Sequence, residues 1–192
     1  MTLNIPNCLT LFRIVAVPII VFIYFLDIKY GNWLNLVLFT LAAISDALDG
    51  YLARKWDQAT KLGAFLDPVA DKLLVTAMLV LLVTNIEILQ EVRVQWLFIV
   101  TVLAIIVREM TVSALREWMA ELGKRSNVAV SSVGKYKTTI QMVAIGFLLV
   151  KERALGLPVL LIGEVLLYIA GILTVWSMCI YLSAAYKTIE DD

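Results

Sequence analysis

Long apolar stretches alternate with short polar ones along the chain. A helix needs about 20 predominantly apolar residues to cross the hydrocarbon core of a bilayer. Six segments approach that length, near residues 11–26, 33–53, 66–86, 94–115, 138–150 and 157–186. The fifth reaches it only if Lys135 and Lys137 lie at its entrance. The pattern therefore predicts an all-α integral membrane protein with six transmembrane helices.

A short polar turn, N-I-P-N at residues 4–7, precedes the first apolar segment. We interpret it as an interfacial lead-in with Asn7 as the helix cap, because asparagine is favoured at that position. The N-terminus lacks the basic start and small-residue cleavage site of a signal peptide. The first apolar segment is therefore expected to be retained.

The composition is that of an integral membrane protein. Hydrophobic residues make up 61% of the 192 residues, and the mean hydropathy is +0.90. Soluble domains are only about 45–50% apolar. The length fits one domain, and neither a repeat nor a linker divides the chain, so residues 1–192 are expected to form a single membrane-embedded unit.

The charges balance, with 16 basic and 16 acidic residues, so nothing indicates a nucleic-acid partner. Six helices would place both termini and alternate loops on one side of the membrane. That side would hold all basic residues except Lys29, Arg93, Lys151 and Arg153. By the positive-inside rule, the termini are expected in the cytoplasm.

The chain contains no histidine, and its two cysteines, Cys8 and Cys179, lie far apart without metal-ligand spacing. No disulfide framework is expected. A general base or metal ligand must therefore come from a carboxylate, a lysine, a tyrosine or a single sulfur. The aspartates are the obvious candidates.

Four aspartates, Asp46, Asp49, Asp67 and Asp71, follow the pattern D-x2-D-G-x2-A-R-x8-G-x3-D-x3-D. Asp46 and Asp49 are three residues apart, and Asp67 and Asp71 four apart, so each pair shares one helix face. The connection between the two helices, residues 55–62, is short. We therefore expect antiparallel neighbours whose carboxylates face each other.

Four ionised aspartates in an apolar context need a compensating charge, because each costs roughly 2.5–3.5 kcal/mol at the centre of a membrane helix. Oxygen ligands alone favour magnesium, manganese or calcium over zinc. Four carboxylates can hold two such ions about 3.5–4 Å apart, which suits phosphoryl displacement. The alternatives are paired structural charges or the path of a divalent-cation carrier, although carriers usually have related halves that this chain lacks.

Other residues of the pattern have expected roles of their own. Gly50 and Gly63 leave room for a ligand or another backbone. Arg54 offers a planar fork that suits phosphate oxygens. Pro68 is expected in the first turn of the third helix or at a bend.

Basic residues near the aspartates predict a cationic rim, made by Arg108, Arg116, Lys135 and Lys137. Such a rim suits a phosphate-bearing acceptor, either glycerol 3-phosphate or an inositol phosphate, rather than serine or choline. The alternatives are charges that orient the protein or contact lipid headgroups and, for Arg108, a buried salt bridge with Glu109.

The aspartate pattern resembles the signature of the CDP-alcohol phosphotransferase family, with every fixed letter present. The resemblance extends along nearly the whole chain. N-I-P-N-C-L-T-L-F-R, G-A-F-L-D-P-V-A-D-K and R-E-M-T-V-S-A-L-R-E-W-M-A-E-L-G-K-R resemble the Gram-negative bacterial members whose acceptor is glycerol 3-phosphate.

This resemblance implies a six-helix fold in the bacterial inner membrane, commonly homodimeric, with a polar cavity open to the cytoplasm. It implies transfer of a phosphatidyl group from CDP-diacylglycerol to sn-glycerol 3-phosphate with release of CMP. It also implies two magnesium or manganese ions, bound by Asp46, Asp49, Asp67 and Asp71, with Asp71 as the base. The expected contacts of the CDP moiety are Gly50, Arg54 and Thr60, joined by the lead-in residues Asn7 and Thr10.

Overall fold

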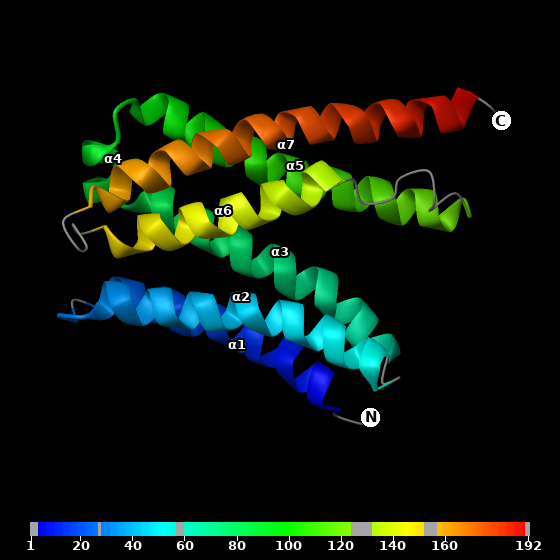
Figure 1. Ribbon diagram of the computed structural model, residues 1–192, viewed down its shortest axis with the longest axis horizontal. Helices are drawn as coiled ribbons and strands as arrows, with labels where there is room; N and C mark the ends of the chain where they lie inside the picture. Colours follow the sequence, from blue (N-terminus) through cyan, green and yellow to red (C-terminus); the bar gives the residue numbers. More distant parts are fainter. Residues whose placement is uncertain (1–3, 27, 57–59, 124–131, 152–156, 191–192) are drawn as a thin grey trace.

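The computed structural model describes residues 4–26, 28–56, 60–123, 132–151 and 157–190, and every regular element in these ranges is a helix (Figure 1). The expected all-α class is confirmed. The long helices run back and forth along one bundle. In chain order the helices are α1 (Ile5–Phe25), α2 (Gly31–Lys55), α3 (Lys61–Thr84), α4 (Ile86–Glu91), α5 (Gln95–Glu121), α6 (Ser132–Val150) and α7 (Val159–Glu190).

Each of the six predicted segments corresponds to a long helix, but the predicted count of six spans is not confirmed. Among the described residues, four stretches are long and apolar enough to cross a membrane: Ile5–Phe25, Gly31–Ala53, Gln95–Glu121 and Val159–Tyr186. In α3 the apolar length is interrupted by Asp67, Asp71 and Lys72. In α6 the described apolar stretch is the shorter Tyr136–Val150. The short helix α4 was not predicted at all.

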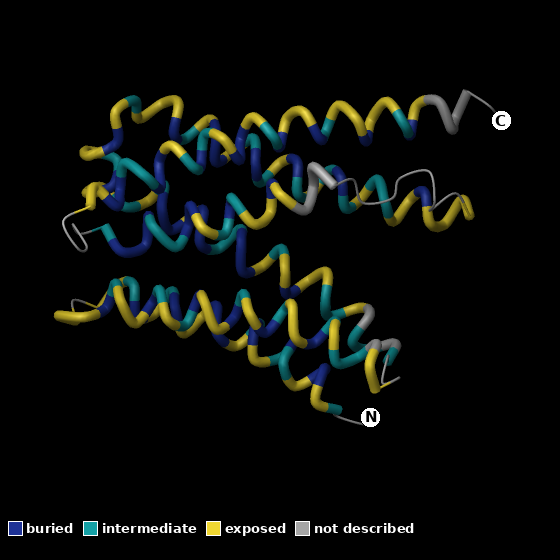
Figure 2. Tube along the Cα trace, in the orientation of Figure 1, coloured by how far each residue is buried: buried dark blue, intermediate teal, exposed yellow. Residues whose placement is uncertain are grey.

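The bundle has an apolar outer surface as well as an apolar core. Along the long helices, buried residues face inward and exposed ones outward (Figure 2). Large apolar side chains are among the most exposed, including Phe25 at 71% and Trp96 at 68%. Extended exposed apolar surface of this kind marks contact with lipid or another protein. With the apolar spans, it indicates a bundle that sits in a bilayer.

Close helix contacts at small residues hold the bundle together. Helix α7 packs along both α5 and α6, while α1 packs against α2 and α3. A side chain added at Gly171 would lie 2.6 Å from the side chain of Thr101, and one at Gly163 would lie 2.8 Å from that of Leu148. These glycines therefore allow α7 to approach α5 and α6, as small residues do between membrane helices.

Helix α1 begins earlier than predicted. The side chain of Asn4 caps it by accepting a hydrogen bond from the backbone N–H of Asn7 at 3.0 Å. Pro6 fits in the first turn because it has no N–H to leave unpaired. The predictions of Asn7 as the cap and of a separate lead-in were therefore wrong, since residues from Ile5 onward are already helical. Pro68 lies inside α3, so of the two positions expected for it the first turn is ruled out.

The helix segments that carry the aspartates and the predicted basic residues lie towards one end of the bundle. The start of α1, the end of α2 and the start of α3 lie there, as do the end of α5, the start of α6 and the C-terminal end of α7 (Figure 1). The aspartates of α2 and α3 and the basic residues of α5 and α6 therefore share one half of the molecule.

Candidate active site

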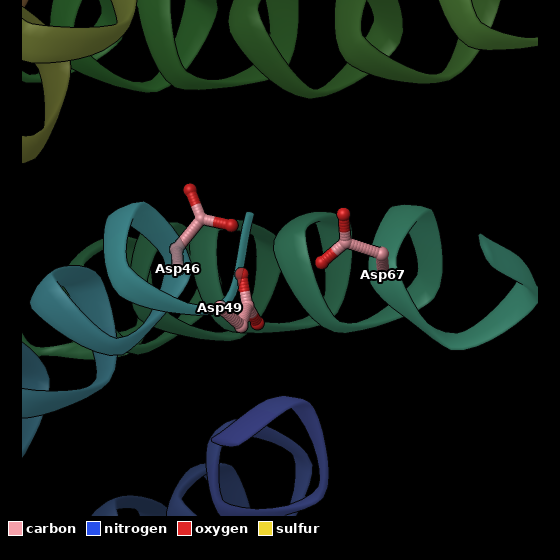
Figure 3. A group of neighbouring side chains, drawn as sticks. All are labelled: Asp46, Asp49 and Asp67. Atoms are coloured by element: carbon pink, nitrogen blue, oxygen red, sulfur yellow. The ribbon is translucent and has the colours of Figure 1, made fainter. Parts of the chain in front are cut away.

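Three aspartates converge between α2 and α3. Asp46 and Asp49 come from α2 and Asp67 from the second turn of α3 (Figure 3). One carboxylate oxygen from each lies within 4.8 Å of the other two. The helical spacing and the short connection bring these groups together in the way the sequence predicts.

The guanidinium of Arg13 in α1 lies in the middle of the acidic cluster. Its Nη1 is 2.5 Å from the carboxylate of Asp46, and its Nη2 is 3.1 Å from that of Asp67. It also forms ion pairs with Asp49 and Asp71. The side chain is fully buried, at 0% exposure. Arg13 thus joins all four aspartates, including Asp71.

Sequence reasoning missed this role of Arg13. The sequence analysis included Arg13 only among the basic residues expected on the cytoplasmic side of the membrane. The available signal was its position, since Arg13 lies within a long apolar stretch, L-F-R-I-V. A charged residue in such a stretch usually faces the interior of the bundle and a partner.

The residues expected to contact the CDP moiety fall into two groups in the structure. Thr10 donates a hydrogen bond to Oδ2 of Asp49 at 3.0 Å, so it reaches the acidic cluster. Thr60 caps α3 through the backbone N–H of Gly63 at 2.9 Å and donates to Oδ1 of Asn7 at 3.0 Å. Asn7 and Thr60 therefore tie the start of α1 to the start of α3.

Gly63 makes this tie possible. A side chain there would place its first carbon 2.7 Å from Oδ1 of Asn7. The sequence predicted that Gly63 leaves room, and the neighbour that uses the room is the Asn7 side chain. Gly50 lies half-buried in α2, directly after Asp49. The side chain of Arg54 lies outside the described residues.

The donor set of the cluster fits a hard divalent cation. All of its ligand atoms are carboxylate oxygens, which magnesium and manganese prefer. Oδ1 of Asp49 is buried and has no hydrogen-bond partner in the part of the chain that the structure describes. A buried charged oxygen in that state is costly unless something binds it. In the described part of the chain, the ion pairs of these four carboxylates are all made with Arg13.

A cavity of about 250 Å³ adjoins the cluster. Asp46 and Asp71 form part of its wall on the acidic side. Arg108 and Arg116 of α5 also line it, together with the uncharged Gln141 of α6. One small polar cavity therefore joins the aspartates to two of the four basic residues that the sequence predicted beside them.

The basic residues differ in their surroundings. Arg108 is buried, donates to Oγ of Ser177 at 3.0 Å and pairs with Glu109 at 3.6 Å. The salt bridge considered for it from the sequence is therefore present, while Arg108 still lines the cavity. Lys137 is fully buried in an ion pair with Glu109 and is not among the described lining residues. The side chain of Lys135 lies outside the described residues.

A second and larger cavity, of about 880 Å³, runs between α2 and α6. Its walls are mainly apolar, with residues such as Trp33, Phe39 and Phe147. Asp46 belongs to the lining of both cavities. The apolar cavity therefore leads to the acidic cluster from one side and the polar cavity from another. Sequence patterns did not predict it, because it is formed between two helices distant in the chain.

Comparison with known proteins bears on what this arrangement does. The family model described as CDP-alcohol phosphatidyltransferase matches residues 3–176. Among curated relatives, a CDP-diacylglycerol–glycerol-3-phosphate 3-phosphatidyltransferase of Escherichia coli K12 is 45% identical over 191 residues, covering 100% of both chains. The enzymes of that name from Salmonella choleraesuis and Shigella flexneri are 46% and 45% identical over the same length, again covering 100% of both chains.

Proposed function

Since the chain belongs to the CDP-alcohol phosphatidyltransferase family, we propose that it transfers the phosphatidyl group of CDP-diacylglycerol to sn-glycerol 3-phosphate, giving phosphatidylglycerophosphate and CMP. One observation of the structure carries this choice. Asp46 lines both an apolar cavity suited to lipid chains and a polar cavity that holds Arg108 and Arg116. A lipid phosphate and a charged acceptor can therefore meet at the aspartates.

The proposed metal ligands are Asp46, Asp49, Asp67 and Asp71, with two magnesium or manganese ions. When bound, such ions neutralise the pyrophosphate and stabilise the charge on departing CMP. Arg13 supplies a fixed positive charge among these four carboxylates. That charge favours phosphate in the site and opposes passage of free cations, which speaks against a cation carrier.

The nucleotide part of the substrate is proposed to lie at the start of α3 and the end of α2. Gly50 and the Asn7–Thr60 pair border this region, and Thr10 connects it to Asp49. Arg54, one turn after Gly50, is proposed to contact a phosphate oxygen. The acyl chains are proposed to occupy the apolar cavity between α2 and α6, so that they remain in the hydrocarbon layer.

The acceptor is proposed to enter the polar cavity with its phosphate on Arg108 and Arg116. Lys135 and Lys137, near the start of α6, remain proposed residues of the acceptor side, with Lys137 held in its ion pair with Glu109. The primary hydroxyl then lies towards Asp71, which accepts its proton as the oxygen attacks the lipid-side phosphorus in line. The new phosphorus–oxygen bond forms as the bond to CMP breaks, so no covalent intermediate with the protein is needed.

The membrane arrangement is proposed to be that of a bacterial inner-membrane protein. In this arrangement the long helices, α3 and α6 included, cross the bilayer, and the end that carries the aspartates faces the cytoplasm together with both termini. The excess of basic residues at that end supports this orientation. We also propose a homodimer, as is common in the family.

An acceptor panel tests the proposed function. Purified protein in detergent receives CDP-diacylglycerol, magnesium and one acceptor, and CMP release is measured. We expect release with sn-glycerol 3-phosphate and little with serine, because Arg108 and Arg116 line the cavity proposed for the acceptor. Turnover with serine alone, or with inositol phosphate in preference to glycerol 3-phosphate, would contradict the acceptor assignment.

Arg116→Ala is expected to raise the KM for glycerol 3-phosphate while leaving that for CDP-diacylglycerol nearly unchanged. A charge-assisted hydrogen bond is worth roughly 1.5–3 kcal/mol, or about 10- to 150-fold in affinity. Initial rates of CMP release, measured while the concentration of one substrate is varied at a time, give the two KM values. The matched control is Arg93→Ala, at the other end of the bundle. Equal rises in both KM values would mean that Arg116 only supports the fold.

Arg13→Gln is expected to lower the apparent melting temperature of metal-free protein by roughly 5 °C or more, because four carboxylates lose their shared counter-ion. Added magnesium should then raise the melting temperature by more than it does in wild-type protein. Thermal unfolding in detergent, with EDTA or with magnesium, provides the comparison, and Arg13→Lys is the charge-retaining control. Identical melting of the glutamine variant and wild type in EDTA would refute the counter-ion role.

A further inference from the structure

A glutamine in the polar cavity has a hydrogen-bonding group that the protein leaves unused. Gln141 lies in α6 and is 1% exposed, yet it belongs to the lining of the cavity that also contains Asp71, Arg108 and Arg116. Its side-chain oxygen, Oε1, is buried without a hydrogen-bond partner among the described residues. A buried amide oxygen in that state is costly, and so calls for a donor from a ligand.

Two nearby cations on α5 and α6 already have partners among the described residues. Lys137, one turn earlier on the same face of α6, forms an ion pair with Glu109. Arg108 donates to Ser177 and pairs with Glu109. No described residue donates to Oε1 of Gln141, so we assign its donor to a molecule that occupies the cavity.

The chemistry of the acceptor limits which of its groups can serve. A doubly ionised phosphate only accepts hydrogen bonds, so it cannot satisfy a carbonyl oxygen. The primary hydroxyl is directed to Asp71, and the phosphate to Arg108 and Arg116. In a glycerol phosphate, only the secondary hydroxyl remains as a donor.

We propose that Gln141 accepts a hydrogen bond from the secondary hydroxyl of the acceptor and thereby selects glycerol phosphate over phosphates of simple alcohols. This inference rests on the proposed function and adds a specificity-determining residue to it. A site built to hydrogen-bond a hydroxyl discriminates strongly against an analogue that lacks it, because its own polar group is then left unpaired.

The test compares two acceptors on three proteins. The acceptors are sn-glycerol 3-phosphate and 3-hydroxypropyl phosphate, which has the same chain without the secondary hydroxyl. The proteins are wild type, Gln141→Leu, which removes the oxygen at similar volume, and Gln95→Leu, the same change at an exposed position at the start of α5. The kcat/KM for CMP release is measured for each pair at saturating CDP-diacylglycerol.

We expect wild type and Gln95→Leu to favour glycerol 3-phosphate by at least about 10-fold. In Gln141→Leu the preference should shrink to about 2-fold or less. The reason is that kcat/KM falls for glycerol 3-phosphate but not for 3-hydroxypropyl phosphate. Gln141→Glu, which keeps an acceptor oxygen, should retain a preference. If melting shows that the leucine variant does not fold, Gln141→Met provides the same comparison.

An unchanged preference in Gln141→Leu would overturn the proposal. So would an equal loss with both acceptors, which would show that the side chain contacts the phosphate or merely supports packing. These failures differ from a failure of the proposed function itself. In that case, wild-type protein would release CMP with neither acceptor.

Discussion

Asp67→Asn is expected to lower turnover by more than about 100-fold while the protein remains folded in detergent. The change keeps the size of the side chain but removes one of three carboxylates that lie within 4.8 Å of one another. Metal-assisted charge stabilisation is worth several kcal/mol, and each 1.36 kcal/mol is about tenfold in rate. CMP release at millimolar magnesium measures the effect.

The matched control for this variant is Glu87→Gln. Glu87 is an exposed carboxylate paired with Lys151 at the other end of the bundle, so the same chemical change there should leave turnover intact. Near-normal CMP release by Asp67→Asn would remove Asp67 from the proposed ligand set. The metal-free form of Asp67→Asn should melt no lower than wild type, because fewer like charges then crowd around Arg13.

Asp71→Glu is expected to retain metal-dependent binding of CDP-diacylglycerol while turnover falls by at least about 100-fold. Asp71 pairs with Arg13 and also lines the polar cavity, so its carboxylate touches both the acidic cluster and the acceptor space. One added methylene moves that carboxylate from its working position, and a misplacement of about 1 Å can cost on the order of 100-fold. Binding and single-turnover measurements separate the two effects.

Two outcomes would change the role given to Asp71. Loss of metal-dependent nucleotide binding in the glutamate variant would indicate that Asp71 acts mainly as a metal ligand. The general-base role would then have no support. Normal turnover would contradict both roles, and the proton would then leave through water or the substrate phosphate. The chain has no histidine, so no imidazole can replace the carboxylate.

The long helices and the aspartate pairs could be predicted because they depend on local spacing. Apolar length predicts membrane helices directly. A separation of three or four residues puts two side chains on one helix face whatever the rest of the fold does. Asp46, Asp49 and Asp67 meet because these local rules act on two helices joined by a short connection.

Features that depend on contacts between distant segments could not be predicted in the same way. The charge of Arg13 in an apolar stretch is a signal, missed in the sequence analysis, that it needs a partner. That signal does not show that its partners lie 33 to 58 residues further along the chain. The sequence analysis did not single out Gln141, a polar residue in an apolar helix. Only the packing of α6 beside the cavity shows that its oxygen is buried, with no partner among the described residues.

The start of α1 shows how two good local signals can compete. Asn4 and Asn7 both suit a helix cap. The earlier one caps the helix, because Pro6 tolerates the first turn and the side chain of Asn7 is engaged by Thr60. That second contact comes from α3, so the sequence around residues 4–7 could not decide between them.

The most direct test of the account is the initial rate of phosphatidylglycerophosphate formation by purified protein. The assay contains CDP-diacylglycerol and sn-glycerol 3-phosphate, and the lipid product is identified by mass spectrometry with magnesium present or with the metal removed by EDTA. We predict product with magnesium, loss of product with EDTA, and recovery when magnesium or manganese is restored. No product with magnesium, or an equal rate in EDTA, would contradict a metal-loaded aspartate cluster as the centre of phosphatidyl transfer.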